Sequence, residues 1–264
     1  MRERTSFAAD LLGRLPRLRL LVTTGMANAA IDLDAAAANG VVVCGTRIMP
    51  GPTAGLTWGL ILGLLRHIPE EAANLRGGGW QTTVGLDLHG LTLGVLGFGR
   101  LGRRVAAVAQ AFEMDVIAWS ANLDPDAARA AGVEPVAFEA LLERSDVLSI
   151  HTRLSDRTRG LIGAAELALM QPTAVLVNTS RGPIVDEAAL VAALRDGTLG
   201  GAALDVFDAE PLPADHPLRT APNTLATPHI GYVTAQNYAL FYGDAVEDIA
   251  AFAAGTPIRV LTGA

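Results

Sequence analysis

The sequence has little of several things that define whole classes of protein. Cys44 is the only cysteine among 264 residues, which excludes an intramolecular disulfide and any metal site built from several cysteines. Aromatic residues make up only 5% of the chain, and no run of Lys or Arg is interleaved with them. The pattern of a nucleic-acid-binding surface is therefore missing. Because the net charge is -7, we expect a small-molecule partner, with no nucleic acid.

Long hydrophobic runs are missing as well. The longest uncharged apolar stretch, 48–65, contains Pro and Gly in its first half, so its helical part is too short to cross a bilayer. The apolar stretch behind the charged N-terminus is broken by Asp10 and Arg14, and no secretory signal is visible. We therefore expect a cytoplasmic protein without a membrane segment. A single reduced cysteine is consistent with the reducing cytoplasm.

What is present indicates a folded α/β protein. Half of the residues are hydrophobic, 18% are charged and 28 are glycine, and a chain of 264 residues is long enough for two domains. Short apolar runs alternate with longer segments of helical period, which predicts a doubly wound parallel sheet of the Rossmann type. The expected strands are 18–22, 41–44, 92–96, 115–118, 147–150, 174–178 and 201–204.

A glycine cluster suggests where the chain divides. The segment 53–75 has the period of one long helix, and the glycines at 77–79 can both end that helix and serve as a hinge. We therefore expect a smaller domain over residues 1–79 and a larger one over 80–234. The segment 235–254 has helical spacing and predicts a helix that packs back on the first domain, so that 235–264 completes it.

A glycine-rich turn follows the predicted strand 92–96 and precedes an amphipathic segment, 105–112. In such a unit Gly97 permits the tight turn, Gly99 lets a pyrophosphate approach the backbone, and Gly102 lets the helix pack closely on the strand. Strand, glycine turn and helix in this order predict a dinucleotide site. Its candidate residues in the turn are Gly97, Gly99, Arg100, Leu101 and Gly102.

The residue that follows the next strand bears on the choice of cofactor. Dinucleotide sites of this kind usually carry Asp or Glu there to bind the ribose 2′-hydroxyl of NAD, but this chain has Ser120. The missing acid removes repulsion of a 2′-phosphate, yet no Lys or Arg follows in the same turn. Ser120 can hydrogen-bond a ribose hydroxyl, so we expect NAD as the cofactor. NADP stays open, because Arg100 or Arg103 could extend to a 2′-phosphate.

Three further segments, 177–190, 203–211 and 227–232, contain Arg181, Glu210 and His229, each just past an apolar run. Together with the glycine turn, their order and spacing closely resemble the D-isomer-specific 2-hydroxyacid dehydrogenases of the phosphoglycerate dehydrogenase type, over nearly the whole chain. The resemblance implies a homodimeric enzyme that acts on CH–OH groups and transfers a hydride between NAD(P) and a small 2-hydroxy or 2-oxo acid.

The expected chemistry needs these residue types. A planar guanidinium such as Arg181 can bind a substrate carboxylate and carbonyl oxygen through paired donors. Histidine suits proton transfer because its unperturbed pKa of ~6.5 lies near the working pH, so His229 is the expected acid in reduction and base in oxidation, with Glu210 as its carboxylate partner. No metal is needed. The other candidate cofactor contacts are Ser120, Thr179, Asp205 and Gly231.

The start of the chain departs from the family pattern. The Arg-x-x-Thr segment at residues 2–5 resembles one that follows an inner strand of the family's flavodoxin-like substrate domain, so at least one βαβ unit, roughly 30 residues, is expected to be missing ahead of it. We expect that domain to keep two strands. Arg2 or Arg4 could still hold a substrate carboxylate, and the turn containing Met26 and Ala27 resembles the loop that offers backbone N–H groups to it.

One alternative from another functional class is open. Some proteins with this fold act as corepressors, so the chain could be an NAD(H)-sensing interaction protein without turnover. Both readings predict cofactor binding, and the presence of Arg181, Glu210 and His229 favours the enzyme. The resemblance does not choose among phosphoglycerate, glyoxylate, hydroxypyruvate, lactate-type acids or formate as substrate.

Overall fold

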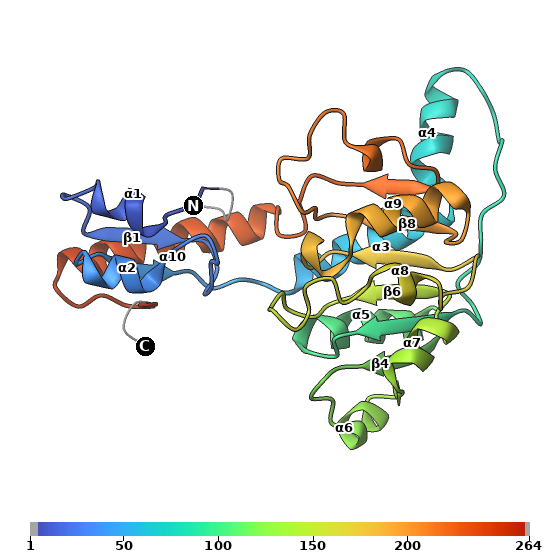
Figure 1. Ribbon diagram of the computed structural model, residues 1–264, viewed down its shortest axis with the longest axis horizontal. Coiled ribbons are helices and arrows are strands. Elements are labelled where there is room, and N and C mark those ends of the chain that lie inside the picture. The colour runs from blue at the N-terminus through green and yellow to red at the C-terminus, as the bar shows by residue number, and fades with distance from the viewer. Residues whose placement is uncertain (1–4, 262–264) are drawn as a thin grey trace. The chain divides into compact units, whose positions relative to one another are not determined.

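A computed structural model describes residues 5–261, and Arg2 and Arg4 therefore lie outside the described residues. The chain forms two compact units: Met1–Pro52 with Tyr232–Ala264, and Thr53–Gly231 (Figure 1). Among the described residues, no helix is long and apolar enough to cross a membrane.

The larger unit contains a seven-stranded sheet in the order β5-β4-β3-β6-β7-β8-β9, with every neighbouring pair parallel. This confirms the predicted doubly wound parallel sheet. The two outermost strands escaped prediction because two or three residues are too short to show a hydrophobic period. The strands are β3 (Thr92–Leu96), β4 (Asp115–Trp119), β5 (Glu134–Pro135), β6 (Val147–Ile150), β7 (Val175–Asn178), β8 (Gly201–Leu204) and β9 (Thr224–Ala226).

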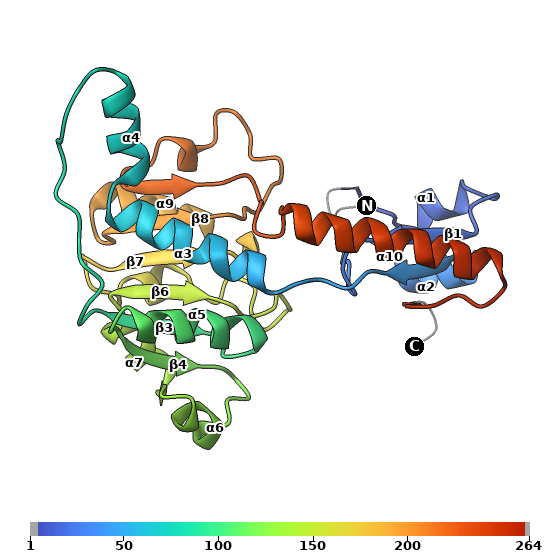
Figure 2. The same cartoon turned by 180° about the vertical axis from the view of Figure 1, so that it is seen from behind.

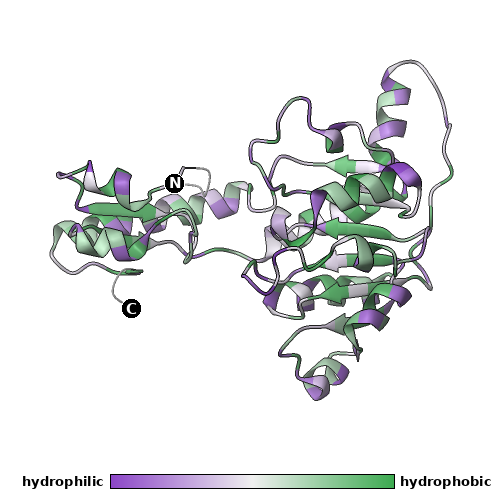
Figure 3. Cartoon of the chain, in the orientation of Figure 1, coloured by the Kyte–Doolittle hydropathy of each residue, from purple (hydrophilic) through white to green (hydrophobic). Residues whose placement is uncertain are grey.

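Helices cover both faces of this sheet (Figures 1 and 2). One face carries α3 (Gly51–Leu65) and α5 (Arg100–Ala111), and the other carries α7 (Phe138–Arg144), α8 (Ala164–Leu167) and α9 (Glu187–Asp196). Successive strand residues point to opposite faces: Val175 and Val177 pack in the first core, and Leu176 packs in the second. The strands consequently appear mostly hydrophobic in Figure 3, as expected of a sheet buried on both sides.

The remaining elements of this unit are short. They are α4 (Ile68–Arg76), α6 (Pro125–Ala130) and the 3-10 helices η1 (Gly182–Ile184) and η2 (Pro217–Arg219). The single helix expected over 53–75 is wrong, because the structure has α3 and α4 separated at His67, whose φ is 50°. The physical reason is Pro69, which has no amide hydrogen to donate and whose ring would collide with the carbonyl of Leu65 in a continuous helix.

The division between the units falls earlier in the chain than the glycine cluster suggested. The expected boundary was 79/80, whereas the compact units divide at 52/53 and again at 231/232. The cause is the apolar face of α3: Leu60, Ile61 and Leu64 are buried in the same cluster as Leu93 and Val95 of β3. Burial of three large aliphatic side chains outweighs the hinge character of a glycine run.

The smaller unit has a two-stranded parallel sheet of β1 (Leu20–Thr23) and β2 (Val42–Gly45). Both predicted strands are present, each displaced slightly toward the C-terminus. The helices are α1 (Ala9–Gly13), α2 (Leu33–Ala38) and α10 (Ala235–Ala253). The last of these matches the expected helix 235–254 and packs against β1, so the C-terminal segment does complete this unit.

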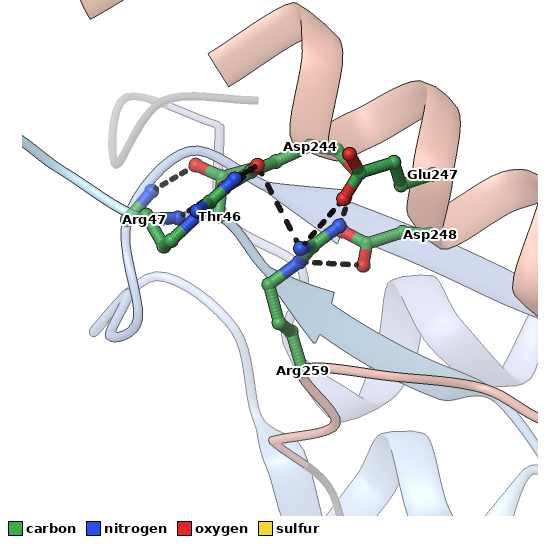
Figure 4. Close-up of polar contacts among 7 residues, drawn as sticks. Thr46, Arg47, Asp244, Glu247, Asp248 and Arg259 are labelled. Carbon is green, nitrogen blue, oxygen red and sulfur yellow. Dashed lines mark hydrogen bonds and ion pairs between the residues drawn. The ribbon is translucent and has the colours of Figure 1, made fainter. Parts of the chain in front are cut away.

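Two arginines fasten α10 within the smaller unit (Figure 4). Arg47 lies 2.6 Å from Asp244 through its Nη2, and Arg259 donates from Nε to Asp248 at 2.9 Å. The carboxylates of both aspartates are almost fully buried. The hydrogen bonds from Arg47 lower the pKa of Asp244 to about 2, so this carboxylate stays ionised at neutral pH.

Candidate functional site

The glycine turn after β3 requires its glycines for steric reasons. Gly97 has a φ of +102°, and a Cβ added to it would lie 2.5 Å from the backbone nitrogen of Thr152. A Cβ on Gly102 would lie 2.3 Å from the carbonyl oxygen of Gly97. Gly99 instead faces open space, with nothing within 4 Å of its added Cβ. The first and third glycines thus allow close packing, and the second leaves the backbone accessible to a ligand.

The N-terminus of α5 is suited to an anion. Its N-cap is Gly99, no side chain caps it, and no acidic residue occupies its first turn. The first amide N–H groups of a helix have no partners inside the helix, and together with the helix dipole they favour a negatively charged ligand. Because Gly99 is accessible at the same point, the residues present fit the pyrophosphate of a dinucleotide.

Ser120 lies directly after β4 and contacts the glycine turn. Its hydroxyl accepts a hydrogen bond from Phe98 N at 2.6 Å. The nearest acid along the chain, Asp124, is engaged elsewhere, because its Oδ1 accepts from the backbone of Asp126 and Ala127 and caps α6. The residue after β4, where many dinucleotide sites have a ribose-binding carboxylate, therefore has a hydroxyl group in this chain.

A cation lies close to this corner. The guanidinium of Arg103 stacks 4.5 Å above the ring of Phe98, and its Nη1 is 3.5 Å from the carbonyl oxygen of Ala127. Among residues 5–261 it forms no ion pair with a carboxylate. Arg103 therefore retains guanidinium donors that no carboxylate of these residues uses.

The three residues singled out for chemistry follow three neighbouring strands. Arg181 follows β7, Glu210 follows β8 and His229 follows β9, and these strands pair in that order in the sheet. Because all are parallel, their carboxyl ends meet at one edge, which is also the edge of the glycine turn (Figure 1). Ligands of open α/β sheets bind at this edge.

The structure brings His229 and Glu210 into contact. His229 Nδ1 lies 2.6 Å from Glu210 Oε2, and the other carboxylate oxygen, Oε1, accepts from Phe207 N at 3.1 Å. The side chains of His229 and Glu210 are 20% and 17% exposed. A partly buried carboxylate at Nδ1 holds the ring in one orientation and leaves Nε2 as the nitrogen able to exchange a proton with a ligand.

Asp205 anchors the turn that carries His229. Its carboxylate accepts from the Thr227 hydroxyl at 2.6 Å, from Ile230 N at 2.8 Å and from Gly231 N at 2.7 Å. The side chain is buried, and burial raises its pKa, although these three donors act in the opposite direction. Both carboxylate oxygens thus accept hydrogen bonds within the protein, and the donors come from residues before and after His229 in the chain.

Arg181 is held by two hydrogen bonds within its own turn. Asn178 Nδ2 donates to its carbonyl oxygen at 2.9 Å, and its own Nη1 donates to Ser180 O at 2.7 Å. A Cβ on the next residue, Gly182, would lie 2.1 Å from the carbonyl carbon of Phe207, so the two backbones touch. The Arg181 segment and the loop that leads to Glu210 therefore form one packed unit.

Thr179 has a partner that the sequence did not suggest. Its hydroxyl is 2.9 Å from that of Thr57, which comes from α3 and also donates to Thr53 O. Thr179 is buried, and this contact ties the end of β7 to a helix more than a hundred residues earlier in the chain. No local pattern could have indicated it.

In the smaller unit, the turn after β1 exposes Met26 and Ala27. The turn is braced because Gly25 N donates to the Thr46 hydroxyl, and a Cβ on Gly45 would lie 2.6 Å from the carbonyl oxygen of Gly25. The backbone at Met26 and Ala27 is therefore held in a defined conformation.

Two further histidines have defined environments. His151 Nε2 lies 2.9 Å from the Ser149 hydroxyl, and burial lowers the pKa of His151 to about 4, so it is neutral at physiological pH and a poor proton donor. His216 forms a second histidine–carboxylate pair, with Glu187 at 3.3 Å. Nothing in the local sequence marks this pair, since Glu187 reads as a helix start and His216 as a turn residue.

Comparison with known proteins agrees with this geometry. Residues 58–231 match the family model of the D-isomer specific 2-hydroxyacid dehydrogenase, NAD binding domain. The glyoxylate reductase of Aeropyrum pernix is 41% identical over 256 residues, which cover 93% of this chain and 76% of that protein. The D-3-phosphoglycerate dehydrogenase of Bacillus subtilis is 36% identical over 98% of this chain, but the chain spans only half of its length.

A solved structure is similar across both units. The crystal structure of a phosphoglycerate oxidoreductase from Vibrio cholerae is 36% identical, with a TM-score of 0.92, and the match covers 96% of this chain and 82% of that one. These relatives are named as reductases, dehydrogenases or oxidoreductases and give no support to the interaction-protein alternative. The chain therefore belongs to the D-isomer specific 2-hydroxyacid dehydrogenase family and is an NAD(P)-dependent oxidoreductase of 2-hydroxy and 2-oxo acids.

Proposed function

We propose that this chain reduces a small 2-oxo acid to the 2-hydroxy acid with NADH, and that glyoxylate is the first substrate to test. The observation that carries the proposal is the 2.6 Å contact between His229 Nδ1 and Glu210 Oε2. It lies at the carboxyl ends of the strands, where Arg181 follows β7. Glyoxylate is put first because the similar protein of Aeropyrum pernix is named a glyoxylate reductase.

In this proposal Arg181 binds the substrate. Its guanidinium donates paired hydrogen bonds to the carboxylate and to the carbonyl oxygen, which fixes the plane of the 2-oxo group and stabilises negative charge that develops on that oxygen. The contacts from Asn178 and from the close approach of Gly182 to Phe207 hold its backbone, and the hydrogen bond from Nη1 to Ser180 O orients the guanidinium.

The protein supplies one proton in the reduction. The bound nicotinamide supplies the hydride that adds to the carbonyl carbon. Nε2 of protonated His229 then gives its proton to the carbonyl oxygen, which becomes the hydroxyl group of the product. Glu210 stabilises the cationic ring from Nδ1, and in the oxidation direction the same nitrogen, Nε2, removes the hydroxyl proton.

For the cofactor, we propose that the pyrophosphate binds at the N-terminus of α5 beside Gly97, Gly99 and Gly102, with Arg100 and Leu101 in the same turn. Ser120 is proposed to hydrogen-bond the adenosine ribose. Further contacts at the nicotinamide end are assigned to Thr179, Asp205 and Gly231. Asp205 would act mainly through the turn that it anchors, because both its oxygens already accept hydrogen bonds.

The smaller unit is proposed to be the substrate domain. Its braced turn would offer the backbone N–H groups at Met26 and Ala27 to the substrate carboxylate, aided by Arg2 or Arg4. A Met26→Pro substitution removes one of these N–H groups. An affinity for a 2-oxo acid that falls twofold or more in this variant would support the assignment.

We further propose a cytoplasmic homodimer. The extended segment between α4 and β3 exposes Trp80 by 79% and Val84 by 90%, and Glu71 braces it by accepting from Thr82 and Thr83. Large apolar side chains held outward on a braced segment suit a contact with a second copy. Light scattering of the protein and of a Trp80→Ala, Val84→Asp variant measures the state, and a monomeric wild type contradicts the proposal.

The test of the function is a panel of 2-oxo acids: glyoxylate, hydroxypyruvate, pyruvate and 3-phosphohydroxypyruvate. NADH or NADPH oxidation is followed by absorbance, with His229→Gln as the matched inactive control. General acid catalysis contributes about 100- to 10,000-fold, so the control should lose that factor in kcat while binding NADH normally. Tight cofactor binding without turnover on any acid would contradict the proposal.

A further inference from the structure

A second glutamate–histidine pair lies beside the proposed catalytic pair. Glu187, the first residue of α9, has its Oε2 3.3 Å from His216 Nε2. Nδ1 of His216 accepts from Leu218 N, so the proton of the neutral ring lies on Nε2, the nitrogen that is close to Glu187. The side chains of Glu187 and His216 are 14% and 21% exposed, close to the values for Glu210 and His229.

Both glutamates bind the same stretch of backbone. Glu210 Oε1 accepts from Phe207 N at 3.1 Å, and Glu187 Oε1 accepts from Asp208 N at 2.8 Å. Two consecutive amide groups of the loop after β8 are therefore held by two different carboxylates. One of these carboxylates also contacts His229, and the other contacts His216.

The peptide between Phe207 and Asp208 is also approached closely by the Arg181 segment. A Cβ on Gly182 would lie 2.1 Å from the carbonyl carbon of Phe207 and 2.5 Å from Asp208 N. No larger residue fits there, so the peptide is in contact both with Gly182 and with the carboxylate of Glu187. A shift of this peptide would therefore move Phe207 N, which donates to Glu210, and would displace Gly182, which follows Arg181.

Glu187 and His216 also line an open cavity of about 690 Å³, together with Arg159, Asp186 and Asp208. Burial raises the pKa of Glu187, with nearby Asp208 acting in the same direction, and the backbone bond from Asp208 and the contact with His216 offset this. The two groups that lower the pKa of Glu187 are therefore the backbone N–H of Asp208 and the side chain of His216.

We propose that Glu187 and His216 form a positioning pair, which holds the Phe207–Asp208 peptide so that Glu210 can orient the ring of His229. The pair does not touch the reactants. The inference rests on the proposed roles of Glu210 and His229, and it adds two residues that act through them.

The experiment compares Glu187→Ala, Glu187→Gln and His216→Gln in the full-length protein. Displacements of about 1 Å at a reacting group cost on the order of 100-fold, so Glu187→Ala is expected to lower kcat about 10- to 100-fold, with KM and the dissociation constant of NADH changed less than threefold. Glu187→Gln keeps an oxygen for Asp208 N and should recover part of the loss. His216→Gln leaves the Glu187–Asp208 bond in place and should fall between Glu187→Gln and wild type.

A matched control removes a charge from the same cavity without touching the loop. Asp186 caps α9 by accepting from Ala189 N, and asparagine caps helices equally well, so Asp186→Asn should turn over at the wild-type rate. If Glu187→Ala does not fold, Glu187→Gln and His216→Gln carry the test.

A spectroscopic readout separates this inference from the proposed function. In ¹⁵N-histidine-labelled protein, long-range ¹H–¹⁵N spectra report which nitrogen of His229 carries the proton. We expect Nδ1 protonation in wild type and Asp186→Asn, and a mixture of tautomers in Glu187→Ala. Wild-type kcat and an unchanged His229 signal in the folded variants would overturn the inference. A changed signal in a protein that turns over no 2-oxo acid would support the positioning role and contradict the proposed function.

Discussion

The substitution Asp205→Asn tests whether one buried carboxylate holds the turn that carries His229. Asparagine has nearly the same shape but only one oxygen, and its amide nitrogen cannot accept. If the remaining oxygen stays with the Thr227 hydroxyl and Ile230 N, the new amide group faces Gly231 N, and that buried N–H loses its acceptor. If the side chain turns over, Thr227 and Ile230 lose their acceptor instead.

The size of the effect follows from these contacts. A hydrogen bond to a charged group is worth about 1.5–3 kcal/mol, and a buried donor without a partner costs about 1–3 kcal/mol. The neutral side chain avoids the burial cost that raises the pKa of Asp205, which offsets part of the loss. We therefore expect the free energy of unfolding to fall by about 2 kcal/mol. Because the turn carries His229, kcat should fall about 100-fold.

Urea unfolding followed by circular dichroism measures the first effect, and NADH oxidation with an active 2-oxo acid measures the second. Thr227→Val is the matched control, since it removes one donor to Asp205 and leaves both backbone bonds, and should cost about 1 kcal/mol. An Asp205→Asn variant with the wild-type urea midpoint and a kcat within twofold of wild type would refute the assignment of Asp205 as the anchor of the His229 turn.

Three further predictions concern the cofactor site and the smaller unit. Ser120→Asp keeps an acceptor for Phe98 N but adds a charge that repels a 2′-phosphate. Fluorescence titration should therefore show NADPH binding weakened at least tenfold and NADH binding unchanged or tighter. Equal losses of affinity for the two cofactors would contradict the position of Ser120 at the ribose. Gly102→Ala places a Cβ against the carbonyl oxygen of the turn and should abolish NADH binding in the same titration. Since Arg47 lowers the pKa of Asp244 to about 2, the stability from this ionised carboxylate is present above its ordinary pKa of 3.8 and is lost as the pH falls toward 2. Asp244→Asn should therefore lower the free energy of unfolding by about 1 kcal/mol at pH 7 and by progressively less in acid, as measured by urea unfolding at both pH values.

Local backbone demands were readable from the sequence alone. The glycine turn could be placed because Gly97 must adopt a positive φ and Gly102 must leave room for a carbonyl oxygen, and no other residue meets either need. The strands β3, β6 and β8 were predicted at their observed bounds, because a strand buried on both faces is an uninterrupted apolar run with turn residues at its ends. Arg181, Glu210 and His229 were singled out because each follows an apolar run, although the strand ahead of His229, β9, was not itself predicted.

Contacts between distant segments were decided only by the tertiary structure. Asp205 was expected to be a cofactor contact, but folding brings Thr227, Ile230 and Gly231 to its carboxylate from more than 20 residues away. The pairing of Glu187 with His216 likewise depends on how α9 and the loop after β8 pack. The boundary at 52/53 depends on which core buries the apolar face of α3. Period and spacing describe what a segment can form, whereas the partner of each buried polar or apolar group is set by long-range packing that no local pattern contains.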